Sequence, residues 1–294
     1  MRPLFKNLQR LFGAVSGPAP IEPLPPLPRY NEIRNFLQTL DMPDDSARRY
    51  FEIHLDRLAL SLALVPAPAR TGRVLELGAY MQMTPALGCV LGYREVRGAY
   101  LGTLGDSSQK LATAAGKEIF SCRFDHFNAE LDPYPYEDST FDCVLACEIF
   151  EHFLHDPVHM LAEAWRVLDR GGTLLLTTPN VASATAVART LEQSGNPQLY
   201  SKYADPRGAS SREEVGHMRE YTPAELRDVL EAAGFEIVHL FTRTAPGYGA
   251  AHARIIPLLQ MLGYPTEMRG EQMFCLARKI APGSTRYPSF LYEI

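Results

Sequence analysis

A strand–helix–strand pattern between Phe141 and Asn180 constrains the fold of this chain more than any other feature. It begins and ends with two short apolar runs, Cys143–Cys147 and Thr173–Thr178. Uninterrupted apolar runs of this length are typical of strands that are buried on both faces, as in a parallel sheet. Parallel strands need a crossover connection, and the segment between the runs is long enough to form one. We therefore expect a βαβ unit here.

The crossover segment has the features of a helix. Asp156 can serve as the N-cap and Pro157 as the first helical residue. Apolar side chains then recur on one helical face: Val158, Leu161, Ala162, Trp165 and Leu168. Gly171 and Gly172 are expected to end the helix. Ligands of such sheets bind beyond the carboxyl ends of the strands, so the residues that follow Cys147 are expected to line a site.

Further strand patterns flank the central unit. Arg73–Leu77 and Arg97–Leu101 precede it, and Asp106 then resembles the N-cap of a helix. Downstream, Phe235–Arg243 and Gln272–Lys279 are apolar or alternating runs. This order of strands and helices predicts a three-layer α/β fold.

The region before the first strand is expected to be helical and proline-rich. Residues 1–12 form a short basic amphipathic pattern, which either contacts a membrane surface or packs on its own domain or a second copy of the chain. Pro18–Pro28 contains six prolines, so residues 1–30 should end in an extended linker. Residues 31–70 then read as a helical lid that is interrupted at Met42-Pro43.

Composition excludes several classes of function. The chain has 294 residues, with 29 basic and 34 acidic side chains and a net charge of −5. This balance offers no general attraction to a phosphate backbone, so we expect no nucleic-acid partner. The five cysteines form no CxxC pair and no metal-ligand spacing, which fits buried thiols in a reducing cytoplasm and predicts no metal site. No apolar run is long enough to span a membrane.

The central unit resembles the class I S-adenosylmethionine-dependent methyltransferases. The resemblance includes VLELGA from Val74 and GHMREYTPAELRDVLEAAGFEI from Gly216, and it extends from Arg73 to Lys279. The sequences of these motifs are similar to those of a bacterial subgroup that is often associated with glycan and cell-surface polysaccharide biosynthesis. The resemblance implies a Rossmann-like, mostly parallel seven-stranded sheet with an antiparallel closing strand. The methyltransferase core would span residues 71–280, with insertions at 195–220 and 244–270 and a tail at 281–294.

The resemblance also implies S-adenosylmethionine as the cofactor and places its contacts. Tyr100 stands where the family usually has an acid that holds the ribose, and Asn128 matches the contact to adenine. The cofactor-binding residues implied in this way are Glu76, Gly78, Ala79, Tyr100, Asn128, Ala129 and Cys147. The bulky side chains of Tyr80–Met83 replace the glycines that a dinucleotide needs, which argues against NAD or FAD.

Methyl transfer to oxygen needs a base for the acceptor proton, and histidine suits that role. His152 follows the central strand and is the first candidate for the base, with His217 and His155 in reserve. His152 can equally pair with Glu148 as a purely structural contact. Arg219 and Tyr221, together with Glu148, are expected to bind a polar acceptor.

Three functions remain open on the sequence. The first is methyl transfer to a small polar acceptor, with O-methylation of a sugar or glycan precursor favoured, in a protein that could form a homodimer. The second is a catalytically silent binding or assembly module, because of Tyr100 and the irregular first loop. The third, a dinucleotide-dependent oxidoreductase or epimerase, is disfavoured by Tyr80–Met83 and by the lack of a Tyr-x-x-x-Lys pair.

Overall fold

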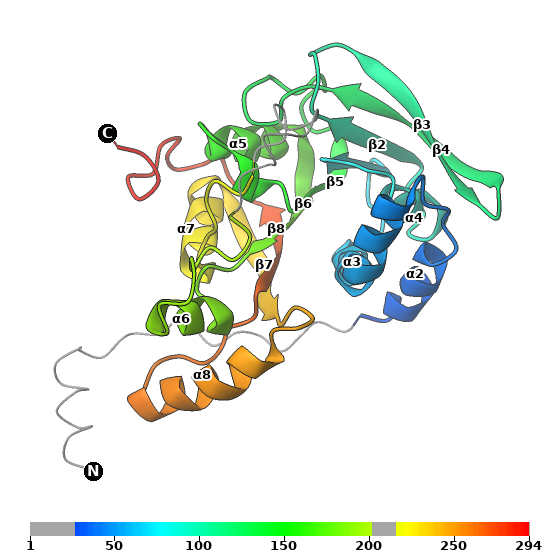
Figure 1. The fold of residues 1–294 in the computed structure, drawn as a ribbon. Helices are drawn as coiled ribbons and strands as arrows, with labels where there is room; N and C mark the ends of the chain where they lie inside the picture. The colour runs from blue at the N-terminus through cyan, green and yellow to red at the C-terminus, as the bar shows by residue number, and fades with distance from the viewer. Residues whose placement is uncertain (1–26, 202–215, 294) are drawn as a thin grey trace.

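The computed structural model describes residues 27–201 and 216–293, so the predicted amphipathic helix at residues 1–12 lies outside the described residues. An eight-stranded sheet in the order β3-β4-β2-β1-β5-β6-β8-β7 forms the middle layer of the fold (Figure 1). The strands are β1 (Arg73–Leu77), β2 (Glu95–Tyr100), β3 (Ser107–Ala114), β4 (Lys117–His126), β5 (Phe141–Cys147), β6 (Leu168–Pro179), β7 (Phe235–Arg243) and β8 (Gln272–Lys279).

Helices cover both faces of the sheet (Figure 1). They are α2 (Tyr30–Leu37), α3 (Asp45–Leu64), α4 (Thr84–Cys89), α5 (Pro157–Val167), α6 (Ala184–Leu191), α7 (Pro223–Ala232) and α8 (Gly249–Leu262), with a 3-10 turn, η1 (Phe150–His152). The first three of these helices pack on one face, and α5 and α7 pack on the other. The predicted interruption at Met42-Pro43 is confirmed, because it falls between α2 and α3.

The central strand β5 is buried on both faces, as its apolar sequence predicts. Val144 and Ala146 belong to the core under α5 and α7. Cys143 and Leu145 belong to the opposite core under α2, α3 and α4. This alternation follows from the period of two in a strand. Because β5 pairs in parallel with β1 and β6, the predicted βαβ unit is confirmed.

The predicted end of the crossover helix was wrong. Helix α5 ends at Val167, and Leu168 already adopts an extended conformation and pairs with Phe141. Gly171 and Gly172 therefore lie inside β6, where the register with β5 is irregular. Gly171 has a φ of 73°, a conformation that glycine adopts at little cost. The two glycines bend a strand instead of capping a helix.

A β-hairpin replaces the helix expected after Asp106. Asp106 precedes strand β3, which runs antiparallel to β4 and brings the sheet to eight strands instead of seven. The turn between them consists of Ala115 and Gly116, which both have positive φ values, 50° and 74°. Two such residues form the tight turn that suits the twist of a hairpin. The antiparallel pairing of β8 with β6 and β7 confirms the predicted closing strands.

The start of α7 allows a direct test of the helix assignment. Thr222 accepts a hydrogen bond from the backbone of Glu225, and the Glu225 side chain accepts one in return. Thr222→Ala is expected to lower the free energy of unfolding by about 1 kcal/mol, because a capping-box hydrogen bond is lost. Urea denaturation of this variant would measure the change. Thr103→Ala, at an exposed loop threonine, should leave the midpoint unchanged, and equal effects of the two substitutions would contradict the role of the cap.

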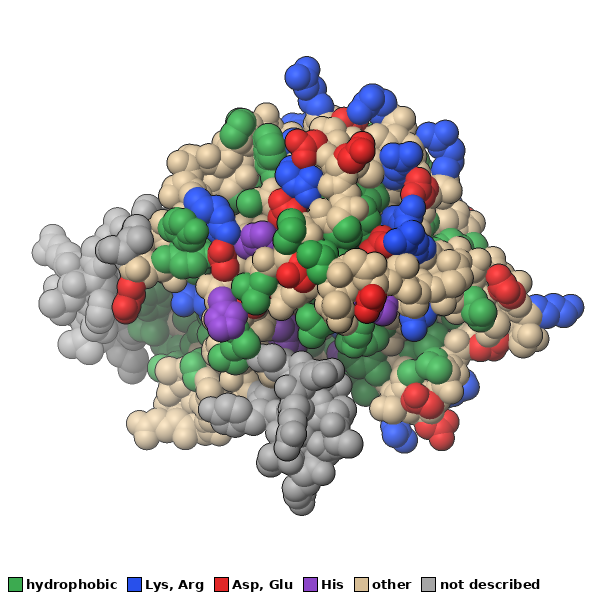
Figure 2. Space-filling view, turned by 90° about the horizontal axis from the view of Figure 1, so that it is seen from above, with side chains coloured by type: hydrophobic (Ala, Val, Ile, Leu, Met, Phe, Trp, Pro, Cys, Tyr) green, Lys and Arg blue, Asp and Glu red, His purple; other side chains and the backbone are tan. Residues whose placement is uncertain are grey.

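On the face seen in Figure 2, basic and acidic side chains lie next to one another. On that face they form no continuous basic stripe of the kind that tracks a nucleic-acid backbone. Among the helices in residues 27–201 and 216–293, none is both long and apolar enough to cross a membrane.

Candidate functional site

The loop after β1 has a backbone shape that depends on glycine. Gly78 has a φ of 63°, and a β-carbon added there would lie 2.5 Å from Cγ2 of Ile149. Ala79 is buried and donates a backbone hydrogen bond of 3.0 Å to the carbonyl of Ala99. The backbone at Gly78 therefore lies close to the loop that follows β5, with no room for a side chain. Such a loop gives a ligand access to main-chain groups.

Glu76 is buried beneath this loop, near the end of β1. Its side chain is 3% exposed, and its Oε2 has no hydrogen-bond partner among the described residues. Burial raises the pKa of Glu76 to about 7, because a charged carboxylate loses solvation in the core. A buried, unpaired carboxyl oxygen is costly to a fold unless another group meets it. The position of Glu76 below the Gly78 loop suits a ligand that donates hydrogen bonds to this carboxyl oxygen.

The end of β2 carries hydroxyl groups in place of the family's acid. Tyr100 is 38% exposed, and its hydroxyl lies 3.1 Å from that of Tyr80. The two rings meet edge to face with centroids 5.1 Å apart. These hydroxyls can donate and accept hydrogen bonds, as the hydroxyls of a ribose require. The loops after β1 and β2 thus fit a nucleoside, although the usual charged contact is replaced.

Asn128 forms a local turn after β4. Its Oδ1 accepts a hydrogen bond of 2.9 Å from the backbone of Glu130, and its own backbone N–H donates to Asp132. The Ala129 carbonyl accepts a bond from Tyr134. Side-chain-to-backbone bonds of this kind are characteristic of Asn in turns. The role of Asn128 and Ala129 at adenine therefore stays a prediction.

Glu148 is the first residue after β5 and is held in a strained conformation. Its φ is 54°, in a region that residues other than glycine rarely adopt. The Thr177 hydroxyl donates to its Oε1, and Arg57 of helix α3 forms an ion pair of 2.9 Å with its Oε2. The Arg57 side chain is 7% exposed, so this pair is shielded from solvent. The helix predicted as a lid therefore delivers a cation to the end of the central strand.

Arg57 was not predicted as a site residue, because its partner lies 91 positions later in the sequence. Its guanidinium also donates a hydrogen bond of 2.8 Å to the hydroxyl of Tyr50. Burial, and then repulsion by Arg57, lowers the pKa of His54 to about 4, so this imidazole is neutral near pH 7. The sequence signal that could have indicated a role for Arg57 was the presence of a charged residue inside an apolar helical segment.

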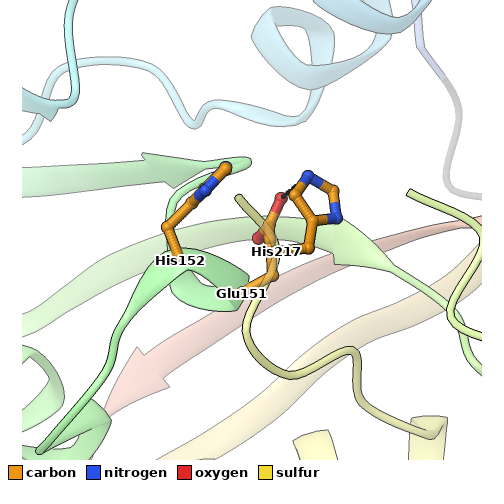
Figure 3. A group of neighbouring side chains, drawn as sticks. All are labelled: Glu151, His152 and His217. Carbon is orange, nitrogen blue, oxygen red and sulfur yellow. Dashed lines mark ion pairs between the residues drawn. The ribbon is translucent and has the colours of Figure 1, made fainter. Parts of the chain in front are cut away.

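The side chains of Glu151, His152 and His217 lie close together (Figure 3). Glu151 also lies near enough to Glu148 and Arg57 for their charges to act on its carboxyl group. One nitrogen or oxygen atom from each of the three side chains lies within 4.8 Å of the others. The rings of His152 and His217 meet edge to face at 4.7 Å between centroids. The structure thus brings together both histidines that were predicted to be catalytic and Glu151, one of the residues after Cys147 that were expected to line the site.

The loop that carries His217 is fixed to η1 by main-chain bonds. The backbone N–H groups of Met218 and Arg219 donate to the carbonyl of Glu151 at 2.8 and 3.2 Å. His217 Nδ1 lies 3.3 Å from Glu220, whose carboxylate also accepts two backbone bonds near Tyr200. The proximity of His217 to Glu151 could not be predicted from local sequence, because several helices and strands separate the two residues along the chain.

The other predicted residues contribute less directly. Arg219 pairs with Glu225 at the start of α7, and Tyr221 is 2% exposed and packs against Phe150. His155 is exposed, outside the cluster of Glu151, His152 and His217. Burial raises the pKa of the Cys147 thiol, so it stays protonated. In this structure these side chains support the loops around the site.

Comparisons with known proteins agree with this geometry. Residues 94–176 match the family described as "Methyltransferase domain". This segment contains β2 to β5, α5 and most of β6, and hence the central βαβ unit. Residues 94–176 are therefore assigned to a methyltransferase domain. The resemblance seen in the sequence is thereby confirmed at the level of a methyltransferase domain.

A curated relative from Mycolicibacterium smegmatis carries the description "Probable S-adenosylmethionine-dependent methyltransferase". It is 30% identical over 126 residues, which cover 43% of this chain. The match spans only 40% of the relative's length, about two fifths. The activity of the whole relative therefore does not carry over to this chain.

Solved methyltransferases are similar over larger shares of the chain but at low identity. An S-adenosylmethionine-dependent methyltransferase from Archaeoglobus fulgidus is 14% identical to this chain, with a TM-score of 0.46. The match covers 94% of this chain and 99% of the Archaeoglobus chain. The 1,6-didemethyltoxoflavin-N1-methyltransferase of Burkholderia thailandensis is 17% identical, with a TM-score of 0.47 and coverages of 88% and 93%. The domain assignment rests on the family match and the strand order.

Proposed function

We propose that the protein transfers a methyl group from S-adenosylmethionine to an oxygen of a small polar acceptor. The observation that carries this proposal is the cluster of Glu151, His152 and His217 beside the loop that follows β5. The same loop meets Gly78, so the groups that could act on an acceptor and the backbone that could hold the cofactor share one edge of the sheet.

The cofactor, when bound, supplies an activated methyl group on a sulfonium. The chain's own task is then to align the acceptor, exclude water and take up the acceptor proton. The Gly78 loop would hold the methionine end, and the Tyr80 and Tyr100 hydroxyls would contact the ribose. His152 is the proposed proton acceptor, with His217 beside it.

A sugar or glycan precursor is the acceptor class that we favour. The cluster presents imidazole and carboxylate groups, and the neighbouring Glu148 carboxylate is already paired with Arg57. Groups of this kind recognise hydroxyl-rich ligands through hydrogen bonds. The resemblance to proteins of bacterial glycan biosynthesis supports the same class. We propose a cytoplasmic location, where such precursors and the cofactor are both present.

Methyl transfer can be tested with the full chain, cofactor labelled with ¹³C on its methyl group, and a panel of nucleotide-linked and free sugars. The expected result is a labelled O-methyl signal in the NMR spectrum of one acceptor class. His152→Gln should lower kcat by about a hundredfold or more, as expected for the loss of a general base. His239→Gln, in strand β7, serves as a histidine control. Label on nitrogen alone would contradict O-methylation.

A catalytically silent binding or assembly module is the second candidate. Tyr100 favours it, because this residue replaces the acid that the family usually has near the ribose. In that case the chain would bind S-adenosylhomocysteine weakly or not at all and would label no acceptor. Asn128→Ala and Gly78→Arg would then leave its cellular function unchanged, whereas an enzyme should lose activity with Gly78→Arg.

A further inference from the structure

We propose that Glu151, His152 and His217 form a binding site for one divalent transition-metal ion. The proposal deepens the proposed function, on which its catalytic meaning rests, by placing a cation where the acceptor oxygen would be activated. The three side chains come from η1 and from a loop near residue 217, so the site exists only in the folded chain.

The spacing of the ligand atoms suits an ion. All three lie within 4.8 Å of one another, and Glu151 Oε1 is 3.8 Å from His217 Nε2. Ligands about 2.1 Å from a tetrahedral metal lie about 3.4 Å apart. Small side-chain rotations would bring the three atoms to that separation. Figure 3 shows both rings beside the Glu151 carboxylate.

A second observation points to a ligand here. Glu151 is completely buried, and its Oε1 has no hydrogen-bond partner within the described part of the chain. Its other oxygen, Oε2, accepts a hydrogen bond of 2.9 Å from Thr178. The unpaired oxygen is the one that faces His217. A buried carboxylate oxygen without a donor is costly, and a cation would remove that cost.

Glu220 orients His217 for this role. It lies 3.3 Å from Nδ1 and is itself 4% exposed and held by the backbone N–H groups of Leu199 and Tyr200. A hydrogen bond from Nδ1–H to a carboxylate leaves the lone pair of Nε2 directed at Glu151. Metal-binding histidines are commonly held by a carboxylate in this way. Without a cation or a proton, two hydrogen-bond acceptors would face each other across the 3.8 Å gap.

Charge and ligand type narrow the choice of ion. Among the described residues, the ion pairs around the cluster involve three carboxylates, Glu148, Glu151 and Glu220, and one guanidinium, that of Arg57. Two imidazoles and one carboxylate suit Zn²⁺, Fe²⁺, Co²⁺ or Mn²⁺ better than Mg²⁺ or Ca²⁺, which prefer oxygen ligands. Three protein ligands leave coordination positions open for an acceptor hydroxyl.

With an ion bound, His152 would be a metal ligand and not the proton acceptor, so the ion would activate the acceptor hydroxyl in its place. It would lower the pKa of an acceptor hydroxyl, whose proton then leaves to solvent. The oxygen lone pair forms the new C–O bond, and the electron pair of the broken C–S bond remains on sulfur. The positive charge of the sulfonium is thereby lost, and the products are an ether and a neutral thioether.

The site can be tested by titrating the full chain with Co²⁺ and Zn²⁺ after removal of metals with a chelator. One ion per chain should bind, with visible Co²⁺ absorption typical of nitrogen and oxygen ligands. His217→Ala and Glu151→Gln should each weaken binding by tenfold or more, and Glu220→Gln by about tenfold. His252→Ala is the matched control, because His252 lies 3.1 Å from another buried carboxylate, Glu271, outside the cluster.

Binding of S-adenosylhomocysteine, measured on the same samples, separates this inference from the proposed function. If the chain binds S-adenosylhomocysteine but takes up no ion, the metal site is wrong and the methyltransferase proposal stands. Ion binding that survives both Glu151→Gln and Glu220→Gln would also overturn the site. The amide oxygen introduced by Glu151→Gln can still accept from the Thr178 hydroxyl, so this variant should keep the fold even if the His217 variant does not.

Discussion

Replacing Arg57 with alanine is expected to lower the free energy of unfolding by about 3 kcal/mol, because the Glu148 carboxylate would lose its buried partner. The pair is only 7% and 21% exposed on its two sides, so water cannot fully replace the guanidinium. Glu148 is also held by Thr177 in a strained conformation, so it cannot easily turn towards solvent. Chemical denaturation at neutral pH would measure the loss.

Arg34→Ala provides a matched comparison. Arg34 pairs with Asp56 of the same helix α3 at 2.7 Å, but the two side chains are 35% and 71% exposed. An exposed pair of this kind contributes about 0–1 kcal/mol. If both substitutions lower stability equally, burial of the Arg57–Glu148 pair has no special energetic role. In that case α3 would only cover the sheet.

The stability of the ligand-free protein is expected to fall as pH rises through the titration range of Glu76. Burial raises the Glu76 pKa from its ordinary 4.5 to about 7. Between these values the unfolded chain releases the proton while the folded chain keeps it, so rising pH favours unfolding. Each pKa unit corresponds to about 1.4 kcal/mol, so the full effect is about 3 kcal/mol between about pH 4 and pH 8.

Glu76→Gln isolates this contribution. The amide cannot ionise, so the variant should lose the part of the pH dependence that belongs to Glu76. Its stability relative to the parent chain should therefore improve from about pH 4 to about pH 8 by about 3 kcal/mol. Parallel stability profiles for the two proteins would show that Glu76 titrates normally and that its carboxyl is not buried as described.

The sequence predicted the elements whose signal is local. The apolar runs of β5 and β6 and the closing strands followed from the periodicity of the sequence. The hairpin after Asp106 was missed, because β3 is rich in polar residues and only one of its eight residues is buried. Its clearest signal was Ala115-Gly116, a short turn between two alternating segments.

The composition of the site depends on contacts between distant parts of the chain. Glu148 and His152 could be predicted as site residues because they follow β5 in the sequence, and the carboxyl ends of parallel strands lie at the same edge of the sheet. No local pattern could place Arg57 against Glu148 or turn the unpaired oxygen of Glu151 towards His217. Both contacts depend on how the lid helix and a later loop pack on the sheet.

Isothermal titration of the full chain with S-adenosylhomocysteine tests whether this edge of the sheet binds the cofactor. We expect saturable binding of one ligand per chain, and strong weakening by Gly78→Val, because a β-carbon there would meet Ile149 at 2.5 Å. Gly92→Val, at a glycine with a φ of 84° and open space around it, controls for backbone strain alone. Absence of binding at millimolar ligand, or equal binding by the Gly78 variant, would contradict a cofactor site on this edge of the sheet.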